Sequence, residues 1–171
     1  MASEVIYSSD GKLIDGIIVK YYEPGKVMSE TPYIGGKING TEIEYYYNGQ
    51  ISEKKEYVNG VLEGTSYVYY QSGVLMEEKT FKDGKLDGVR KLYYETGVLK
   101  QTEEYQNDIL NGRIAIYSPD GSMEEEVFYR KGIKVEKEEN VVRSREEEEK
   151  ANLEEAKKKE GLTDEELSKI L

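Results

Sequence analysis

One octet of residues recurs along the chain at a fixed interval, and this recurrence limits the folds that are open to it. The octet reads FKDGKLDG at residues 81–88, and related octets occupy 33–40, 57–64, 105–112 and, less regularly, 129–136. Each copy begins 24 residues after the one before it. Because the spacing is kept without an insertion, the chain is predicted to consist of repeated units.

Glycines and aromatic residues follow the same period. One set of turn glycines falls at Gly25, Gly49, Gly73, Gly97 and Gly121, and another at Gly16, Gly40, Gly64, Gly88 and Gly112. One aromatic column is Tyr33, Tyr57, Phe81, Tyr105 and Tyr129, and the other is Tyr21, Tyr45, Tyr69, Tyr93 and Tyr117. Columns that stay in phase over nearly five units indicate that the repeat is the fold itself.

Each unit has the pattern of a β-hairpin. The segment 41–47 is rich in strand-forming residues, Asn48–Gly49 can turn the chain, and 51–58 runs back to Asn59–Gly60. An Asn-Gly pair between two such runs favours a hairpin turn in which both residues have positive φ. The predicted fold class is mainly β, an elongated single-layer antiparallel β-meander of 24-residue hairpin repeats with a C-terminal α-helical segment.

The faces of this sheet are not expected to be apolar throughout. In the return strand Ile51, Glu53, Lys55 and Tyr57 share one face by alternation, so the middle of that face is charged. Apolar residues make up only 37% of the chain, and tyrosine supplies 16 of them. We therefore expect a thin sheet that is wet on much of both sides.

The composition changes after the repeats. Residues 1–135 are predicted to form the β-repeat domain, and 136–171 a tail rich in Glu, Lys and Arg. Residues 140–160 consist largely of helix formers, Gly161 interrupts them, and 162–171 restart with capping-box spacing. The tail is therefore predicted to be a helical hairpin that covers the last strand, with a merely solvated charged helix as the alternative.

The residue types exclude several classes of chemistry. The chain has no His and no Cys, so Ser-His-Asp and Cys-His sites and zinc bound by His or thiolate are impossible. A net charge of −11 without a basic stripe disfavours nucleic acid and anionic membranes. One repeat position is occupied by Glu53, Glu77, Gln101 and Glu125. We interpret these carboxylates as residues of a solvated strand face rather than as the acid–base pair of a hydrolase. We predict no enzyme activity, no cofactor and no metal.

The tyrosine pairs are the candidate binding residues. Tyrosine serves both as a cross-strand packing residue and as a residue enriched at interaction hot spots. Successive residues of a strand point to opposite faces, so each pair serves both faces of the sheet. The predicted binding residues are Tyr46, Tyr70 and Tyr94, together with Tyr45, Tyr69 and Tyr93.

The best copies of the repeat, YYQSGVLMEEKTFKDGKLDG at 69–88 and YYETGVLKQTEEYQNDILNG at 93–112, resemble the variant MORN repeat. This repeat occurs in many bacterial proteins, among them the YwqK-family antitoxins. The resemblance covers about 7–135, with Asp108 in place of a glycine and Glu136 in place of the last closing glycine. The resemblance implies an elongated single-layer sheet with a binding role, and it does not imply a reaction.

Two kinds of function follow as expectations. The first is a scaffold for protein–protein interaction, such as an antitoxin-like binder of a basic partner protein. The alternative is binding of membrane phospholipid or cell-surface glycan through the tyrosine-rich face, although the choline-binding repeats that also contain YYxxG rely on Trp, which is absent here. The chain contains no secretory signal or transmembrane segment, so it is expected to be cytoplasmic as it stands, or exported if a signal was removed.

Overall fold

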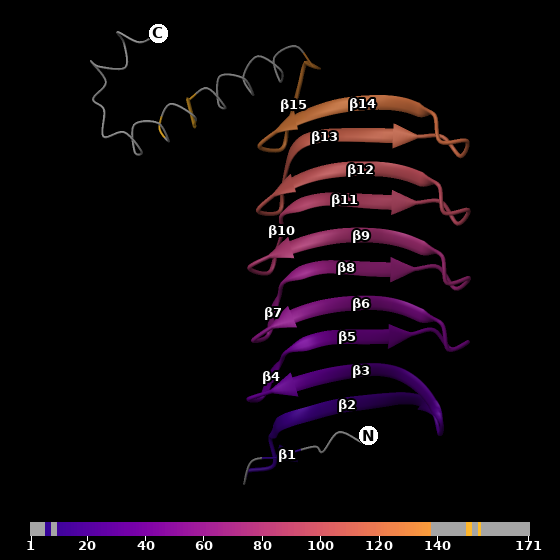
Figure 1. The fold of residues 1–171 in the computed structure, drawn as a ribbon, viewed down its shortest axis with the longest axis vertical. Helices are drawn as coiled ribbons and strands as arrows, with labels where there is room; N and C mark the ends of the chain where they lie inside the picture. Colours follow the sequence, from indigo (N-terminus) through magenta and orange to yellow (C-terminus); the bar gives the residue numbers. More distant parts are fainter. Residues whose placement is uncertain (1–5, 8–9, 138–149, 152–153, 155–171) are drawn as a thin grey trace.

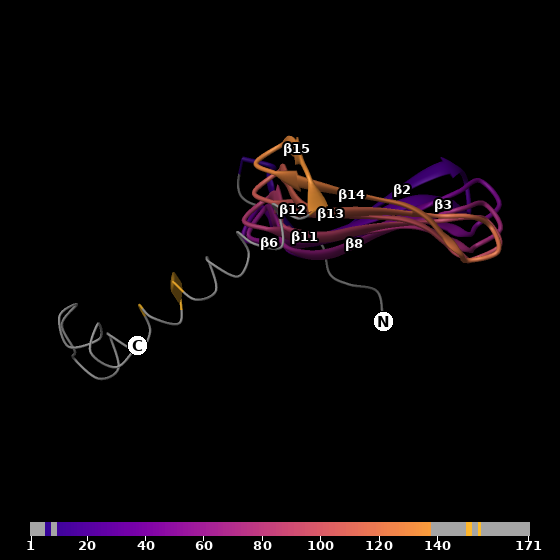
Figure 2. The same cartoon turned by 90° about the horizontal axis from the view of Figure 1, so that it is seen from above.

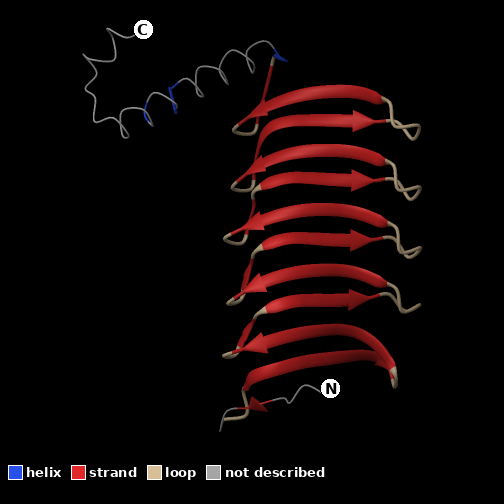
Figure 3. Ribbon diagram, in the orientation of Figure 1, coloured by secondary structure: helices blue, strands red, loops and turns tan. Residues whose placement is uncertain are grey.

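The computed structural model describes residues 6–7, 10–137, 150–151 and 154. Its strands form one antiparallel sheet in which neighbours along the sheet follow the order of the chain (Figures 1 and 3). Figure 2, taken along the stack of strands, shows them superposed in a single curved layer. The strands are β1 (Ile6–Tyr7), β2 (Leu13–Glu23), β3 (Lys26–Ile34), β4 (Lys37–Ile38), β5 (Gly40–Tyr45), β6 (Ile51–Val58), β7 (Val61–Leu62), β8 (Gly64–Tyr69), β9 (Leu75–Lys82), β10 (Lys85–Leu86), β11 (Gly88–Tyr93), β12 (Leu99–Gln106), β13 (Ile109–Tyr117), β14 (Met123–Arg130) and β15 (Ile133–Val135).

The two turns of each repeat have different conformations. At one end of the strands both turn residues have positive φ, as in Asn59 (52°) and Gly60 (84°), which is the type I′ hairpin turn. At the other end Gly49 has a φ of 85°, whereas Asn48 is not among the residues with positive φ. The Gly49 amide donates to the Tyr46 carbonyl and the Tyr46 amide to the Gln50 carbonyl, which is typical of a three-residue loop with a glycine bulge. The expectation of two positive φ values at Asn48–Gly49 is therefore wrong.

Each type I′ turn is held by the preceding repeat. The amide of Asn59 donates to the side-chain oxygen of Asn39 at 3.3 Å, and the amide of Gly60 donates to the carbonyl of Ile38 at 2.7 Å. The same pair of bonds recurs at every 24-residue step, and the side-chain acceptors are Asp15, Asn39, Glu63, Asp87 and Asn111. The octet therefore joins one repeat to the next as well as turning the chain.

The outgoing strand of most repeats is broken just before a glycine. β4 and β5, β7 and β8, and β10 and β11 are pairs of pieces separated by one residue, whereas β13 is continuous over the same stretch. The glycines that follow the break have positive φ, 110° at Gly40 and 127° at Gly88, which favours a residue without Cβ. Across the strand pair these glycines lie opposite the aromatic column, for example Gly40 opposite Tyr57.

The sheet has almost no apolar core. Among the described residues, Ala115 is the one fully buried hydrophobic residue, while the buried polar residues are Ser29, Thr31, Ser66, Glu77 and Glu103. A single layer has no second layer to pack against, so its stability depends on cross-strand hydrogen bonds and on side chains that lie along the sheet.

The predicted fold class is wrong in its helical part. Residues 6–7 and 10–136 make up the strands and turns of the sheet. Lys137, Lys150, Ala151 and Glu154 have a helical backbone, but the described residues contain no helical element. Residues 138–149, 152–153 and 155–171, over which most of the helical hairpin was expected, lie outside the described residues, and so does any cover that they give to the last strand. A segment rich in helix formers has only a weak intrinsic preference for the helical conformation, because helices in proteins gain most of their stability from tertiary packing. The described part of the chain contains no helix long and apolar enough to cross a membrane.

Candidate functional site

The second tyrosine of each Tyr-Tyr pair connects neighbouring repeats. The hydroxyl of Tyr46 donates to the backbone carbonyl of Tyr69 at 2.6 Å, and that of Tyr70 to the carbonyl of Tyr93 at 2.8 Å. Tyr22 and Tyr94 make the equivalent bonds to Tyr45 and Tyr117. Four tyrosines thus form a ladder along one end of the strands, here called the tyrosine ladder (Tyr22, Tyr46, Tyr70, Tyr94).

The first tyrosine of each pair has different neighbours. The hydroxyls of Tyr45 and Tyr93 lie 3.4 Å from carboxylate oxygens of Glu30 and Glu78. Burial, and then the nearby carboxylate, raises the pKa of Tyr45 and Tyr93, and burial also raises the pKa of Tyr69. These phenols therefore remain protonated donors at neutral pH.

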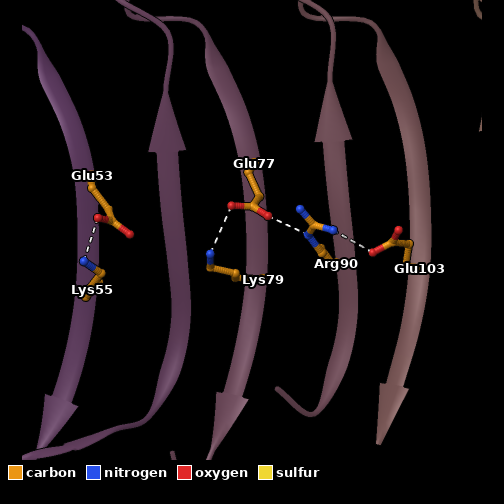
Figure 4. Close-up of polar contacts among 6 residues, drawn as sticks. All are labelled: Glu53, Lys55, Glu77, Lys79, Arg90 and Glu103. Carbon is orange, nitrogen blue, oxygen red and sulfur yellow. Dashed lines mark hydrogen bonds and ion pairs between the residues drawn. The ribbon is translucent and has the colours of Figure 1, made fainter. Parts of the chain in front are cut away.

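A row of charged side chains crosses the middle of one face of the sheet (Figure 4). Lys55 contacts Glu53 at 2.6 Å, and Lys79 contacts Glu77 at 3.0 Å. Arg90 lies between two carboxylates and bonds Glu77 through Nε and Glu103 through Nη1, at 2.5 and 2.9 Å. We call the group Glu53, Lys55, Glu77, Lys79, Arg90 and Glu103 the charged row.

The charged row is largely neutralised from within. Burial by itself would raise the pKa of Glu77, but hydrogen bonds from Arg90 and Lys79 outweigh it and leave this pKa below the ordinary value. Burial would likewise lower the pKa of Arg90, and the bonds to Glu77 and Glu103 raise it instead. The row therefore consists of ion pairs with fixed partners. This arrangement stiffens the sheet and does not resemble a pair of carboxylates set for acid–base chemistry.

Ser66 lies in the middle of this row. It is opposite Lys79 on the neighbouring strand, it is only 1% exposed, and its hydroxyl oxygen has no hydrogen-bond partner among the described residues. No group of three or more carboxylates in the described part of the chain is arranged to hold a metal ion.

The residues predicted from sequence as binding residues are grouped at one end of the strands. Tyr46, Tyr70 and Tyr94 belong to the tyrosine ladder, and Tyr45, Tyr69 and Tyr93 precede them. Their use in binding remains a prediction, because their observed contacts are within the sheet. The sequence reasoning did not predict the Arg90 cluster, although Arg90 stands where the preceding repeats have Glu42 and Ser66.

Three stretches of the chain, residues 38–59, 62–83 and 86–107, match the family model described as MORN repeat variant. No curated protein matches the chain. Among solved structures, one similar chain belongs to the "Crystal structure of accessory secretory protein 1,2 and 3 in Streptococcus pneumoniae", with 16% identity and a TM-score of 0.36. The match covers 68% of this chain and 22% of that one, so this chain spans about a fifth of the protein that it matches. Three stretches within residues 38–107 are therefore similar to MORN repeat variants.

Proposed function

We propose that the protein is a non-catalytic scaffold that binds a partner protein along the tyrosine end of its sheet. The single observation that carries the proposal is the regular tyrosine ladder, which places one half-buried phenol ring of each repeat along the same end of the strands. A row of rings held at a fixed spacing suits recognition of an extended surface, because rigid tyrosines contribute contact area at a low cost in side-chain entropy. Matches to MORN repeat variants, which are commonly protein- or membrane-binding modules, support a scaffold role.

The charge of the chain indicates the kind of partner. The protein carries a net charge of −11, and Glu95 lies exposed beside the tyrosine end, where Glu23 is already paired with Lys26 and Tyr47. Most charges of the charged row are already paired, so the exposed carboxylates outside it determine the field that a partner meets. We therefore propose a basic partner, whose association would be steered electrostatically and weakened by salt. A basic toxin neutralised by this protein would fit this description.

The test is a binding measurement with matched variants. The immobilised protein is used to capture partners, and each captured protein is then purified and titrated against the wild type. It is also titrated against Tyr46→Leu, Tyr70→Leu and Tyr94→Leu. We expect at least a tenfold weaker affinity for these three, since aromatic hot-spot residues cost about 2 kcal/mol or more when truncated. Tyr57→Leu, a change in the other aromatic column, is the control and should bind as the wild type does.

Phospholipid or glycan binding is the competing function, and it makes a different prediction. Sedimentation with anionic vesicles or with cell-wall polysaccharide, in the absence of any protein partner, would contradict the scaffold proposal. Equal affinity of the wild type and the three ladder variants for the purified partner would contradict the assignment of the tyrosine end as the binding surface.

A further inference from the structure

Among the described residues, one edge of the sheet is open over six residues of β2. Strand β2 pairs with β3 along its length, but on its other side β1 is registered only against Leu13 and Asp15. From Ile17 to Tyr22 the outer edge of β2 has no strand partner among the described residues. Such an edge offers unpaired amides and carbonyls to another strand.

This edge is more apolar than the strands that it repeats. By alternation Ile17, Val19 and Tyr21 lie on one face, and the exposed fractions of Ile17 and Tyr21 are 38% and 51%. On the other face Ile18 stands where the next repeat has Glu42. Edges that remain free are normally protected by charges, whereas here a run of β-branched and aromatic residues carries only Lys20.

The opposite edge of the sheet is built differently. The edge strand β14 carries three consecutive glutamates, Glu124, Glu125 and Glu126, of which Glu126 is ion-paired with Arg113 and Lys137. If two such edges paired antiparallel about Glu125, Glu125 would lie opposite Glu125 and Glu124 opposite Glu126. Pairing of this edge with β2 of another molecule is also obstructed. β15 lies five repeats of 24 residues after residues 13–15 and is their structural equivalent. It pairs with β14, so it already occupies the place along β14 that residues 13–15 of a second molecule would need.

We propose that a second copy of this chain pairs antiparallel with the Ile17–Tyr22 edge, with Val19 of each copy opposite Val19 of the other. A two-fold axis perpendicular to the sheet keeps both copies facing the same way, so residues on the same face become neighbours. Val19 then meets Val19, Ile17 meets Tyr21, and Ile18 meets Lys20. Centring the pair on Lys20 would instead place two ammonium groups opposite each other.

The paired segment ends where β1 begins. With Val19 at the centre, Tyr22 of one copy lies opposite Gly16 of the other, next to Asp15, the last residue covered by β1. The pairing therefore leaves the described residues of β1 in place. Because both copies keep the same face, the sheet would continue through the junction. The strand direction reverses across the two-fold axis, so the two tyrosine ladders would lie at opposite ends of the strands.

Disulfide trapping tests the register directly. The chain contains no cysteine, so Val19→Cys introduces a single thiol. Directly opposite residues of an antiparallel pair have Cα atoms about 4.5–5.5 Å apart, which matches disulfide geometry. We expect mild oxidation to convert most of this variant into a cross-linked dimer. The control is Val127→Cys on the other edge, which should cross-link only to the background extent.

Light scattering of the unmodified protein supplies an independent measure. A single strand pair buries less than the roughly 1,200–2,000 Å² of a standard interface, so we expect a reversible dimer whose mass falls to that of one chain on dilution. Val19→Lys should remove the dimer at all concentrations, while Val127→Lys should leave it unchanged. Circular dichroism checks that each variant keeps the sheet.

Each outcome decides the proposal. A wild type that has the mass of one chain at every concentration, together with a folded Val19→Cys protein that does not cross-link, would overturn it. The proposal would also be overturned if Lys20→Cys molecules formed a disulfide with Glu125→Cys molecules while two Val19→Cys molecules formed none with each other. That result would indicate head-to-tail assembly.

Discussion

The hydroxyl of Tyr70 donates a hydrogen bond of 2.8 Å to the backbone carbonyl of Tyr93, which lies 23 residues further along the chain. The bond spans one repeat, and the same relationship holds for Tyr46 and Tyr69. A side chain that is predicted to recognise a partner therefore also ties two repeats together. Bonds of this kind explain how a thin sheet without an apolar core can hold the predicted recognition residues in fixed positions.

Tyr70→Phe should destabilise the sheet while keeping its ring. Loss of one hydrogen bond to a backbone carbonyl costs about 0.5–1.5 kcal/mol in the free energy of unfolding. Urea denaturation followed by circular dichroism measures this change. Tyr21→Phe, at a tyrosine that is half exposed, is the matched control and should change the free energy of unfolding by much less. Equal effects of the two substitutions would show that the bond contributes nothing to stability.

Arg90→Met should be more damaging than the removal of one surface charge. Without Arg90, Glu77 and Glu103 lose a partner, although the side chains of both are only about a tenth exposed. Leaving buried polar groups unsatisfied costs about 1–3 kcal/mol. The double variant Glu77→Gln/Arg90→Met should recover part of this loss in the same denaturation experiment. If the double variant is less stable than the sum of the single changes predicts, the ion pair is not the cause.

Stability should fall on acidification because of Glu77. Burial opposes its charge, yet hydrogen bonds from Arg90 and Lys79 leave its pKa below the ordinary value of 4.5. As pH falls, the unfolded chain binds this proton before the folded chain does. The contribution of Glu77 is therefore present above about pH 4.5 and lost below it. Urea denaturation in steps from neutral pH to about pH 3 should show a shallower fall for Glu77→Gln than for the wild type.

At alkaline pH the strand tyrosines should lower the stability of the fold as pH rises, which is the opposite pH dependence from that of Glu77. Burial raises the pKa of Tyr45, Tyr69 and Tyr93 above the ordinary value of 10.0. The unfolded chain therefore loses these protons first, and the stability that they contribute is present below pH 10.0 and lost as pH rises further. Phenolate absorbance should rise at higher pH in the folded protein than in urea. Coincident curves would contradict the burial of these hydroxyls.

The side chains that accept hydrogen bonds from the type I′ turns offer a direct test of how the repeats are joined. Asp87→Ala should remove the acceptor of the Asn107 amide, which is bonded at 3.1 Å, and lower the free energy of unfolding by about 0.5–1.5 kcal/mol. Asp87→Asn keeps a side-chain oxygen and should be close to the wild type, since Asn39 fills the equivalent position two repeats earlier. An equal loss in both variants would indicate that the charge, rather than the acceptor, is required.

The sequence by itself determined the period, the places where the chain turns and the order in which hairpins follow one another. These are local properties, because Asn-Gly and Asp-Gly pairs restrict φ within two residues, and the period is visible in the printed chain. It also indicated that Glu53 and Lys55 share a face, and they form an ion pair there. The conformation of the 48–49 turn was not determined, since the same dipeptide serves a type I′ turn at Asn59–Gly60 and a longer loop at Asn48–Gly49.

Only the tertiary structure decided which residues of different repeats meet. Arg90 lies 13 residues from both Glu77 and Glu103, and it reaches them because antiparallel pairing places β9, β11 and β12 side by side in one register. The bonds from Tyr70 to Tyr93 and from the Asn107 amide to Asp87 likewise depend on the position of a neighbouring strand. A repeat period gives the spacing of such residues along the chain. Their contacts follow from the register and the face of each strand, and a shift of one residue would move every side chain to the other side.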